Sequence, residues 1–298
     1  MKLKFIVLVA AIVVSFNTTG ESTTRLNLLV PAYFYPAGTG LTDWNRLTSA
    51  SSLVSLTAIM NPGNGPGTIA DPNYVAAVSN VRNAGGSVAG YVYTSYAARS
   101  LATVEADIAS YASFNYNING IFVDEMANAP TAANLGYYAS LYAYIKTTHP
   151  DWHVFGNAGT STDPAFLTGP NGRTADTLMV FENAQAAYPG YTPDAWNAGF
   201  ARNNFGHIIH TTADAPTMSA DLDRAISLNA GYAFVTDDIL PNPYDTLPAY
   251  WPAEVGKVQS TPVPEPVGFL GIGALTIVLC ATGRRTKKPL PCTNPSSQ

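Results

Sequence analysis

Short apolar runs alternate with longer segments of mixed polarity along most of the chain. Eight of these runs have the length and composition of buried strands, and they cover residues 28–34, 56–60, 87–93, 118–124, 152–156, 177–181, 206–211 and 231–236. Between them the pattern predicts helices over residues 43–52, 74–84, 103–114, 131–148 and 217–229, with little regular helix between the fifth and sixth strands.

This alternation of strand and helix predicts an α/β fold, a single (β/α)8 TIM barrel that spans residues 26–258. An open doubly wound sheet is the competing architecture. It needs a glycine-rich phosphate-binding turn after the first strand, and Pro31-Ala-Tyr-Phe-Tyr-Pro36 offers none. We therefore expect the strands to close into a barrel.

The N-terminus has the composition of an export signal. Lys2 and Lys4 precede the apolar run 5–16, which has the length of a signal-peptide core and is short for a membrane span. We expect residues 1–20 to be a signal peptide. The alternative is a buried N-terminal helix.

The C-terminus divides into a proline-rich spacer (259–266), a hydrophobic segment with a basic stop (267–288) and a terminal tail (289–298). Val263-Pro-Glu-Pro266 and Arg284-Arg285 flank the apolar stretch. This arrangement resembles the PEP-CTERM sorting signal, which implies an exosortase-type processing enzyme as a partner. A plain single-span anchor is the alternative. Either way we expect a secreted or cell-surface protein that meets the membrane only through this segment.

Charge and cysteine content narrow the function of the body. The whole chain carries −5, but nine basic and nineteen acidic residues between positions 5 and 263 leave 9 − 19, or −10. Such a body repels nucleic acid and anionic lipid and tolerates neutral or cationic polymers. Cys280 and Cys292 both lie in the tail. A disulfide framework, a cysteine nucleophile and a zinc-cysteine site are therefore excluded from the body.

Polar side chains gather at the predicted carboxyl ends of the strands, where TIM barrels carry their active sites. These positions hold Tyr33, Tyr35, Asn61, Tyr93, Asp124, Glu125, Asn157, Glu182, His210, Asp237 and Asp238. We expect a substrate-binding site at this end of the barrel.

The strongest candidate for catalysis is Gly120-Ile-Phe-Val-Asp-Glu125, an apolar strand that ends in two acids. Side chains alternate along a strand, so only one of Asp124 and Glu125 is expected to point into the barrel mouth. We favour Asp124, with Glu125 in a supporting or capping role. The alternative is that both acids cap the following helix. Glu182 ends the sixth strand in the same way, across the mouth.

Two carboxyl groups that flank one pocket suit glycosidic hydrolysis, which needs a proton donor and a second carboxylate that attacks or stabilises the anomeric carbon. Asn157 follows the fifth strand between them and can hydrogen-bond a sugar hydroxyl or acetamido group, or can be a turn residue. Asp237 can likewise contact substrate or belong to a loop. His207 and His210 lie on opposite sides of a strand, so we expect no metal site there and His210 at most lines the pocket. We expect no cofactor.

Several ordered motifs resemble the spherulin-4 family. They are Leu29-Val-Pro-Ala-Tyr-Phe-Tyr-Pro36 with Trp44, Met60-Asn-Pro-Gly-Asn-Gly-Pro-Gly67, Gly90-Tyr-Val-Tyr-Thr-Ser-Tyr96 with Arg99, and Gly120-Ile-Phe-Val-Asp-Glu125. That family is a glycoside hydrolase group of barrel fold, related to endo-α-1,4-galactosaminidases. The resemblance implies cleavage of an α-1,4-linked polysaccharide that contains N-acetylgalactosamine or galactosamine.

The family's functional Asp, Asn and Glu match Asp124, Asn157 and Glu182. By analogy with barrel α-glycosidases, we expect a retaining endo-glycosidase with Asp124 as nucleophile, Glu182 as general acid and then base, and Asn157 positioning the substituent at carbon 2. The alternative function is a non-catalytic polysaccharide-binding surface protein that uses the same cleft.

Overall fold

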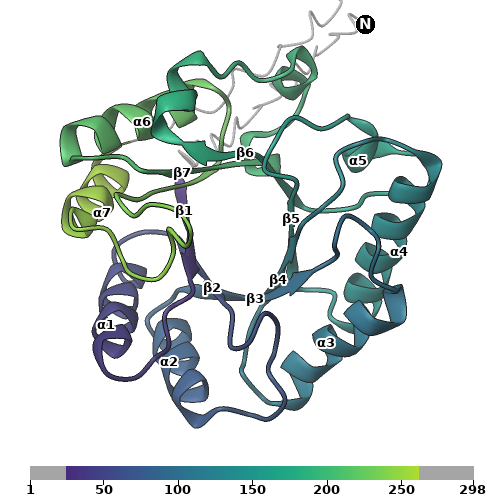
Figure 1. The fold of residues 1–298 in the computed structure, drawn as a ribbon, viewed down its shortest axis with the longest axis horizontal. Coiled ribbons are helices and arrows are strands. Elements are labelled where there is room, and N and C mark those ends of the chain that lie inside the picture. The colour runs from purple at the N-terminus through teal and green to yellow at the C-terminus, as the bar shows by residue number, and fades with distance from the viewer. Residues whose placement is uncertain (1–24, 262–298) are drawn as a thin grey trace, which may run out of the picture. The chain divides into compact units, whose positions relative to one another are not determined.

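The computed structural model describes residues 25–261, which form a closed barrel of parallel strands with helices around it (Figure 1). The predicted signal peptide over residues 1–20 and the predicted sorting tail from residue 262 onward lie outside the described residues. Within residues 25–261, no helix has the length and apolar character that a membrane span requires. The described residues include the whole of the predicted barrel, 26–258.

Eight strands follow one another around the barrel, and each pairs in parallel with the next. They are β1 (Asn27–Ala32), β2 (Leu56–Met60), β3 (Ser87–Tyr93), β4 (Gly120–Asp124), β5 (His153–Asn157), β6 (Thr177–Ala184), β7 (Phe205–His210) and β8 (Tyr232–Val235). β8 also pairs with β1, where Asn27 lies opposite Tyr232, and this pairing closes the barrel. The predicted single (β/α)8 TIM barrel is thus confirmed, and the open sheet is excluded.

Helices cover the outside of the barrel (Figure 1). Within the described range they are α1 (Thr39–Ser51), α2 (Pro72–Asn83), α3 (Leu101–Ser113), α4 (Ala132–Thr148), α5 (Ala165–Thr168), α6 (Ala215–Ser227) and α7 (Trp251–Ser260). Between β6 and β7 the chain forms short 3-10 helices, η1 (Gln185–Gly190), η2 (Ala195–Gly199) and η3 (Arg202–Asn204). The sequence pattern does not predict α7, whose last two residues lie in the predicted spacer 259–266.

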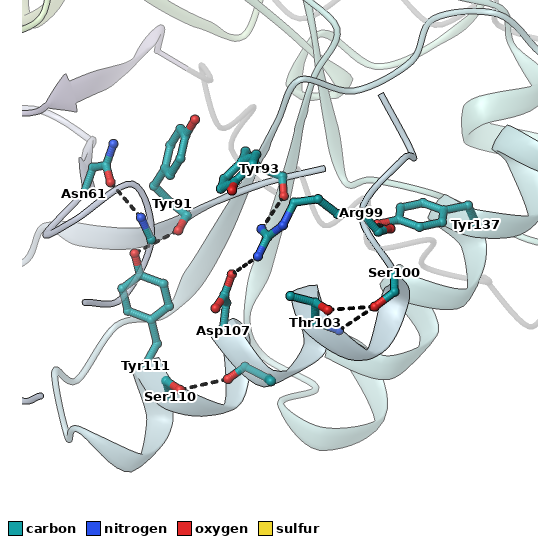
Figure 2. Close-up of polar contacts among 12 residues, drawn as sticks. Asn61, Tyr91, Tyr93, Arg99, Ser100, Thr103, Asp107, Ser110, Tyr111 and Tyr137 are labelled. Carbon is teal, nitrogen blue, oxygen red and sulfur yellow. Dashed lines mark hydrogen bonds and ion pairs between the residues drawn. The ribbon is translucent and has the colours of Figure 1, made fainter. Parts of the chain in front are cut away.

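Side-chain caps start four of the helices. Asp71, Ser100, Thr131 and Asp214 each accept a hydrogen bond from a backbone N–H in the first turn of α2, α3, α4 and α6. Such caps satisfy donors that have no partner inside the helix. Figure 2 shows the cap at Ser100. Asp43, expected at a helix start, instead lies inside α1, which begins four residues earlier at Thr39.

Close packing between α3 and β3 positions Tyr91, a residue of the candidate site. Tyr111 of α3 lies against β3 at Gly90, where an added Cβ would be 2.8 Å from the Tyr111 ring. Its hydroxyl donates to the carbonyl of Tyr91 at 2.8 Å, as Figure 2 shows. α3 can approach β3 this closely only at a glycine. The contact therefore fixes the position of Tyr91 along the barrel axis.

Strand β6 is longer than predicted, and this changes the setting of Glu182. The sequence pattern ends the strand at Phe181, but β6 continues to Ala184 and pairs with β7 along this extension. A register shift between Met179 and Phe181 precedes the extension. Glu182 is therefore held by strand pairing opposite Ile208, and it does not lie in a loop.

Candidate active site

Three neighbouring strands bring the predicted acid, amide and acid together. Asp124 is the last residue of β4, Asn157 is the last residue of β5, and Glu182 lies near the end of β6. The amide nitrogen Nδ2 of Asn157 donates one hydrogen bond to Asp124 Oδ1 at 2.8 Å and another to Glu182 Oε2 at 2.6 Å. Parallel strands end at the same edge of a barrel, so these side chains converge at its mouth.

The bridging amide limits how far apart the two carboxyl groups can be. Asp124 Oδ1 and Glu182 Oε2 both lie on one nitrogen, so their separation cannot exceed the sum of the two distances, 5.4 Å. Asn157 is buried, and its Oδ1 is a buried acceptor with no hydrogen-bond partner among the described residues. That oxygen is free to accept a hydrogen bond from a bound ligand.

Two tyrosines donate hydrogen bonds to the two carboxyl oxygens that Asn157 does not contact. Tyr91 donates to Asp124 Oδ2 at 2.8 Å, and Tyr244 donates to Glu182 Oε1 at 2.5 Å. Tyr33, predicted to bind substrate, lies between these tyrosines, with edge-on ring contacts of 5.6 Å to each. Every side-chain oxygen of Asp124 and Glu182 thus accepts a hydrogen bond from Asn157, Tyr91 or Tyr244.

The sequence pattern does not identify Tyr91 and Tyr244 as site residues. Tyr91 lies two residues before Tyr93 in β3, and the period-two spacing of a strand is the signal that identifies it. Tyr244 lies in the loop between β8 and α7, far from any predicted strand end. Nothing in its sequence neighbourhood indicates that it reaches Glu182, 62 residues earlier.

Burial makes Glu182 a weaker acid. Its removal from water raises its pKa above the usual value, and the negative charge of Asp124 raises it further. The hydrogen bonds from Tyr244 and Asn157 stabilise the carboxylate and offset part of that rise. Burial, helped by the nearby carboxylates, also raises the pKa of Tyr33, Tyr91 and Tyr244. These tyrosines therefore remain neutral hydrogen-bond donors.

A pocket of about 290 Å³ opens over the carboxyl pair. It is lined by Tyr96, Asp124, Glu125, Asn157, Ala158, Gly159 and Glu182. At Gly159 a Cβ would lie 3.4 Å from the Glu182 Cβ and 3.8 Å from its Oε2, and φ is +64°. A glycine here leaves this wall of the pocket open and permits the left-handed backbone.

The expectation that only one of Asp124 and Glu125 faces the mouth is wrong, since both line the pocket. Glu125 has φ of 50°, in the left-handed region, so the chain leaves the strand conformation directly after Asp124. Strand alternation holds only while the backbone remains extended. Three acidic residues, Asp124, Glu125 and Glu182, therefore line the pocket.

Two of the other predicted binding residues stabilise loops at the mouth. Tyr35 is 49% exposed, and its hydroxyl donates to Asp71 at 3.0 Å and accepts from Asn73 at 2.7 Å. The Asn61 Oδ1 accepts the backbone N–H of Gly65 at 2.9 Å and so shapes the turn after β2. Neither residue lines the pocket over the carboxyl pair.

Three further predicted residues also lie outside the lining of this pocket. Tyr93 packs under the guanidinium of Arg99, 4.0 Å from its ring centroid. His210 is buried, and its Nδ1 pairs with the hydroxyl of the neighbouring threonine at 2.8 Å. Asp237 accepts the backbone N–H of Ala249 at 3.2 Å. These contacts all stabilise loops or strand ends.

The histidines of β7 are engaged within the fold. His207 is fully buried, its Nδ1 pairs with the Tyr188 hydroxyl at 2.8 Å, and burial lowers its pKa to about 3. Among residues 25–261, no group of three or more His, Cys, Asp or Glu side chains is arranged to hold a metal ion.

The barrel is similar to known proteins in sequence and in fold. The model of a family described as "Spherulation-specific family 4" matches residues 27–258. Spherulin-4 of Physarum polycephalum is 30% identical over 255 residues, which make up 82% of this chain and 73% of that protein. Aspergillus clavatus Sph3, solved in complex with GalNAc, has a TM-score of 0.70 and 26% identity and covers 80% of this chain and 98% of its own.

A more distant structure shares the barrel fold. A cyclic α-maltosyl-(1→6)-maltose hydrolase from Arthrobacter globiformis has a TM-score of 0.51 at 10% identity, and the match covers 80% of this chain and 81% of that one. At this identity the likeness concerns the fold alone. The described body therefore shares its barrel fold with this hydrolase.

Proposed function

The chain belongs to the Spherulation-specific family 4, and from that premise we propose that it is a glycoside hydrolase acting on α-1,4-linked polymers of N-acetylgalactosamine or galactosamine. The observation that carries the proposal is the bridge that Asn157 makes between the two carboxyl groups, which holds Asp124 Oδ1 and Glu182 Oε2 at most 5.4 Å apart. The complex of the similar Sph3 with GalNAc supports the substrate class.

The separation of the carboxyl groups favours a retaining mechanism. Retaining glycosidases hold their two carboxyls about 5–5.5 Å apart, whereas inverting enzymes need about 6.5–9.5 Å to admit a water molecule between the general base and the sugar. The upper limit of 5.4 Å between Asp124 Oδ1 and Glu182 Oε2 fits the first class. For an α-linked substrate, retention releases the α-anomer first, and NMR of the earliest product distinguishes it from the β-anomer that inversion gives.

In this mechanism the carboxylate of Asp124 attacks the anomeric carbon while protonated Glu182 gives its proton to the glycosidic oxygen. The bond between the anomeric carbon and the glycosidic oxygen breaks. Water then attacks the anomeric carbon of the glycosyl ester, Glu182 takes a proton from that water, and the ester bond to Asp124 breaks. The raised pKa of Glu182 suits a proton donor. The unpaired Oδ1 of Asn157 can accept a hydrogen bond from the 2-amino or 2-acetamido N–H.

A reducing-end assay of wild type and Glu182→Gln on a panel of amino-sugar polymers tests the proposal. The amide keeps the shape of the side chain but cannot donate an acidic proton, so we expect cleavage to fall at least 10²-fold while binding is retained. Glu105→Gln, a matched change at a half-buried position of α3 outside the pocket, should leave cleavage unchanged. Equal background release by both proteins on every polymer they bind would support instead a polysaccharide-binding protein.

We also propose that the barrel acts outside the cytoplasm. The cationic and apolar N-terminus and the Val263-Pro-Glu-Pro266 tail support export and processing by an exosortase-type enzyme. N-terminal sequencing of protein recovered from the medium or the cell surface tests this. A chain that keeps residues 1–20 and remains in the cytoplasm would contradict it.

A further inference from the structure

The turn between β3 and α3 contains three successive residues in the left-handed region. The φ angles are 45° at Ser95, 57° at Tyr96 and 69° at Ala97. None of these residues is glycine, and a Cβ opposes this conformation. Non-glycine residues persist there only where their surroundings hold them, and such sites cluster at binding and catalytic centres.

The backbone of the two pocket acids holds one side of this turn. The N–H of Thr94 donates to the carbonyl of Asp124 at 3.1 Å, and the N–H of Tyr96 donates to the carbonyl of Glu125 at 2.8 Å. The Thr94 hydroxyl also donates to the Glu125 carbonyl at 2.8 Å. The turn is thus fixed directly to the segment that presents the carboxyl groups.

Arg99 holds the other side of the turn. Its guanidinium donates to the carbonyl of Tyr93 at 2.7 Å and to Asp107 of α3 at 2.8 Å, as Figure 2 shows. The carbonyl of Arg99 in turn accepts the hydroxyl of Tyr137 at 2.9 Å, and its N–H donates to the Thr94 carbonyl at 3.0 Å. Both ends of the turn are therefore anchored to the barrel and to α3 and α4.

The turn presents Tyr96 to the pocket. Tyr96 is 67% exposed, and it lines the pocket together with Asp124 and Glu182. Among residues 25–261, its ring makes no aromatic contact and its hydroxyl makes no hydrogen bond. A large aromatic side chain held rigidly at a pocket, with its ring unused by the fold, is available to a ligand.

We propose that Tyr96 is a platform for a pyranose ring of the polymer, next to the ring held by the carboxyl pair. The inference rests on the proposed function and adds a binding residue to it. The C–H face of a pyranose packs on an aromatic ring, and an amino sugar adds attraction between its ammonium group and the ring. The anchored turn orders the ring before binding, so little conformational entropy is lost when the polymer arrives.

The substitution Tyr96→Gly separates this role from a purely structural one. Glycine adopts the left-handed conformation without strain, so the variant should fold and its Tm should not fall. Loss of the platform should nonetheless raise KM for the polymer about three- to tenfold, with kcat within about twofold of wild type. Tyr96→Phe keeps the ring and should restore KM. Leu53→Ala, an exposed apolar residue between α1 and β2, is the control.

The experiment measures Tm, polymer affinity, KM and kcat for these three variants and wild type on N-acetylated and de-N-acetylated galactosamine polymers. If the KM of Tyr96→Gly equals that of wild type, the inference is overturned and the proposed function remains intact. If wild type binds without cleaving, weaker binding by Tyr96→Gly alone supports the platform. A wild type that neither binds nor cleaves would overturn the proposed function and this inference with it.

Discussion

Burial and hydrogen bonding have opposite effects on the pKa of Glu182. Burial and the charge of Asp124 raise its pKa, while the hydroxyl of Tyr244 and the amide of Asn157 stabilise its charged form. As a general acid it must be protonated, so activity should fall as the pH rises through its pKa. In the proposed role of Glu182 as general acid, the contacts of this one side chain set the alkaline limit of catalysis.

Tyr244→Phe should move that limit to higher pH. The substitution removes a hydrogen bond that favours the carboxylate, so the pKa of Glu182 should rise further. The measurement is kcat/KM as a function of pH. Tyr142→Phe removes an equivalent hydroxyl from Asp176, outside the pocket, and should leave the profile in place. An alkaline limb that stays or moves to lower pH would contradict this assignment of the acid.

At the residue scale, the sequence predicts which residues form the site better than it predicts where their side chains point. Asp124, Asn157 and Glu182 are predictable because polar residues at neighbouring strand ends must converge in a barrel. The position of Glu125 is not, because its left-handed φ of 50° is a backbone property that alternation cannot reveal. Tyr244 is not predictable either, since it reaches Glu182 through a loop whose path depends on tertiary packing.

At the scale of elements, α7 attaches to the barrel through a buried acid. Glu254 is fully buried, and its Oε1 accepts the N–H of Val235 in β8 at 3.0 Å. Its Oε2 has no hydrogen-bond partner within residues 25–261. Burial, with a further contribution from the charge of Asp237, raises the pKa of Glu254 to about 8. The folded protein therefore holds a proton that the unfolded chain releases above its ordinary glutamate pKa.

This proton should make stability depend on pH. Between pH 4.5 and about 8 the unfolded chain has lost the proton and the folded protein keeps it, so Glu254 should lower the free energy of unfolding as pH rises, by up to about 1.4 kcal/mol per unit. Glu254→Gln keeps the acceptor for Val235 and removes the titration. Urea unfolding should show that the free energy of unfolding of the variant, relative to that of wild type, is greater at pH 8 than at pH 5. An equal change in the free energy of unfolding between pH 5 and pH 8 for the two proteins would contradict the prediction. The control Glu105→Gln should keep the pH dependence of wild type.

The elements themselves show which patterns a sequence reveals. The bounds of β2 and β3 follow from apolar runs that end sharply at polar residues or turns, and the structure confirms them. α7 escapes prediction because Pro252 and Gly256 weaken its helical pattern, although a proline in the first turn is compatible with a helix. β6 extends past its apolar run because β7 continues to pair with it. Pairing between strands lies beyond a local pattern.

At the scale of the molecule, the distribution of charge agrees with the pocket. The segment between residues 5 and 263 has a net charge of −10. The pocket over the carboxyl pair is lined by Asp124, Glu125 and Glu182 and by no Lys or Arg side chain among the described residues. A cationic polymer, such as a de-N-acetylated galactosaminan, is attracted to such a surface at long range, whereas a fully N-acetylated polymer is not.

Salt should therefore separate the two polymers. The Debye length falls from about 30 Å at 0.01 M salt to about 3 Å at 1 M, so long-range attraction by the body is lost across that range. We expect KM for the de-N-acetylated polymer to rise about tenfold between low and high salt, because steered association changes by 10-fold or more. KM for the N-acetylated polymer should change little, since its contacts with Tyr96 and Asn157 are short-range. Steady-state kinetics on both polymers in a NaCl series measures the difference. Equal salt dependence for the two would mean that the net charge of the body does not contribute to substrate capture.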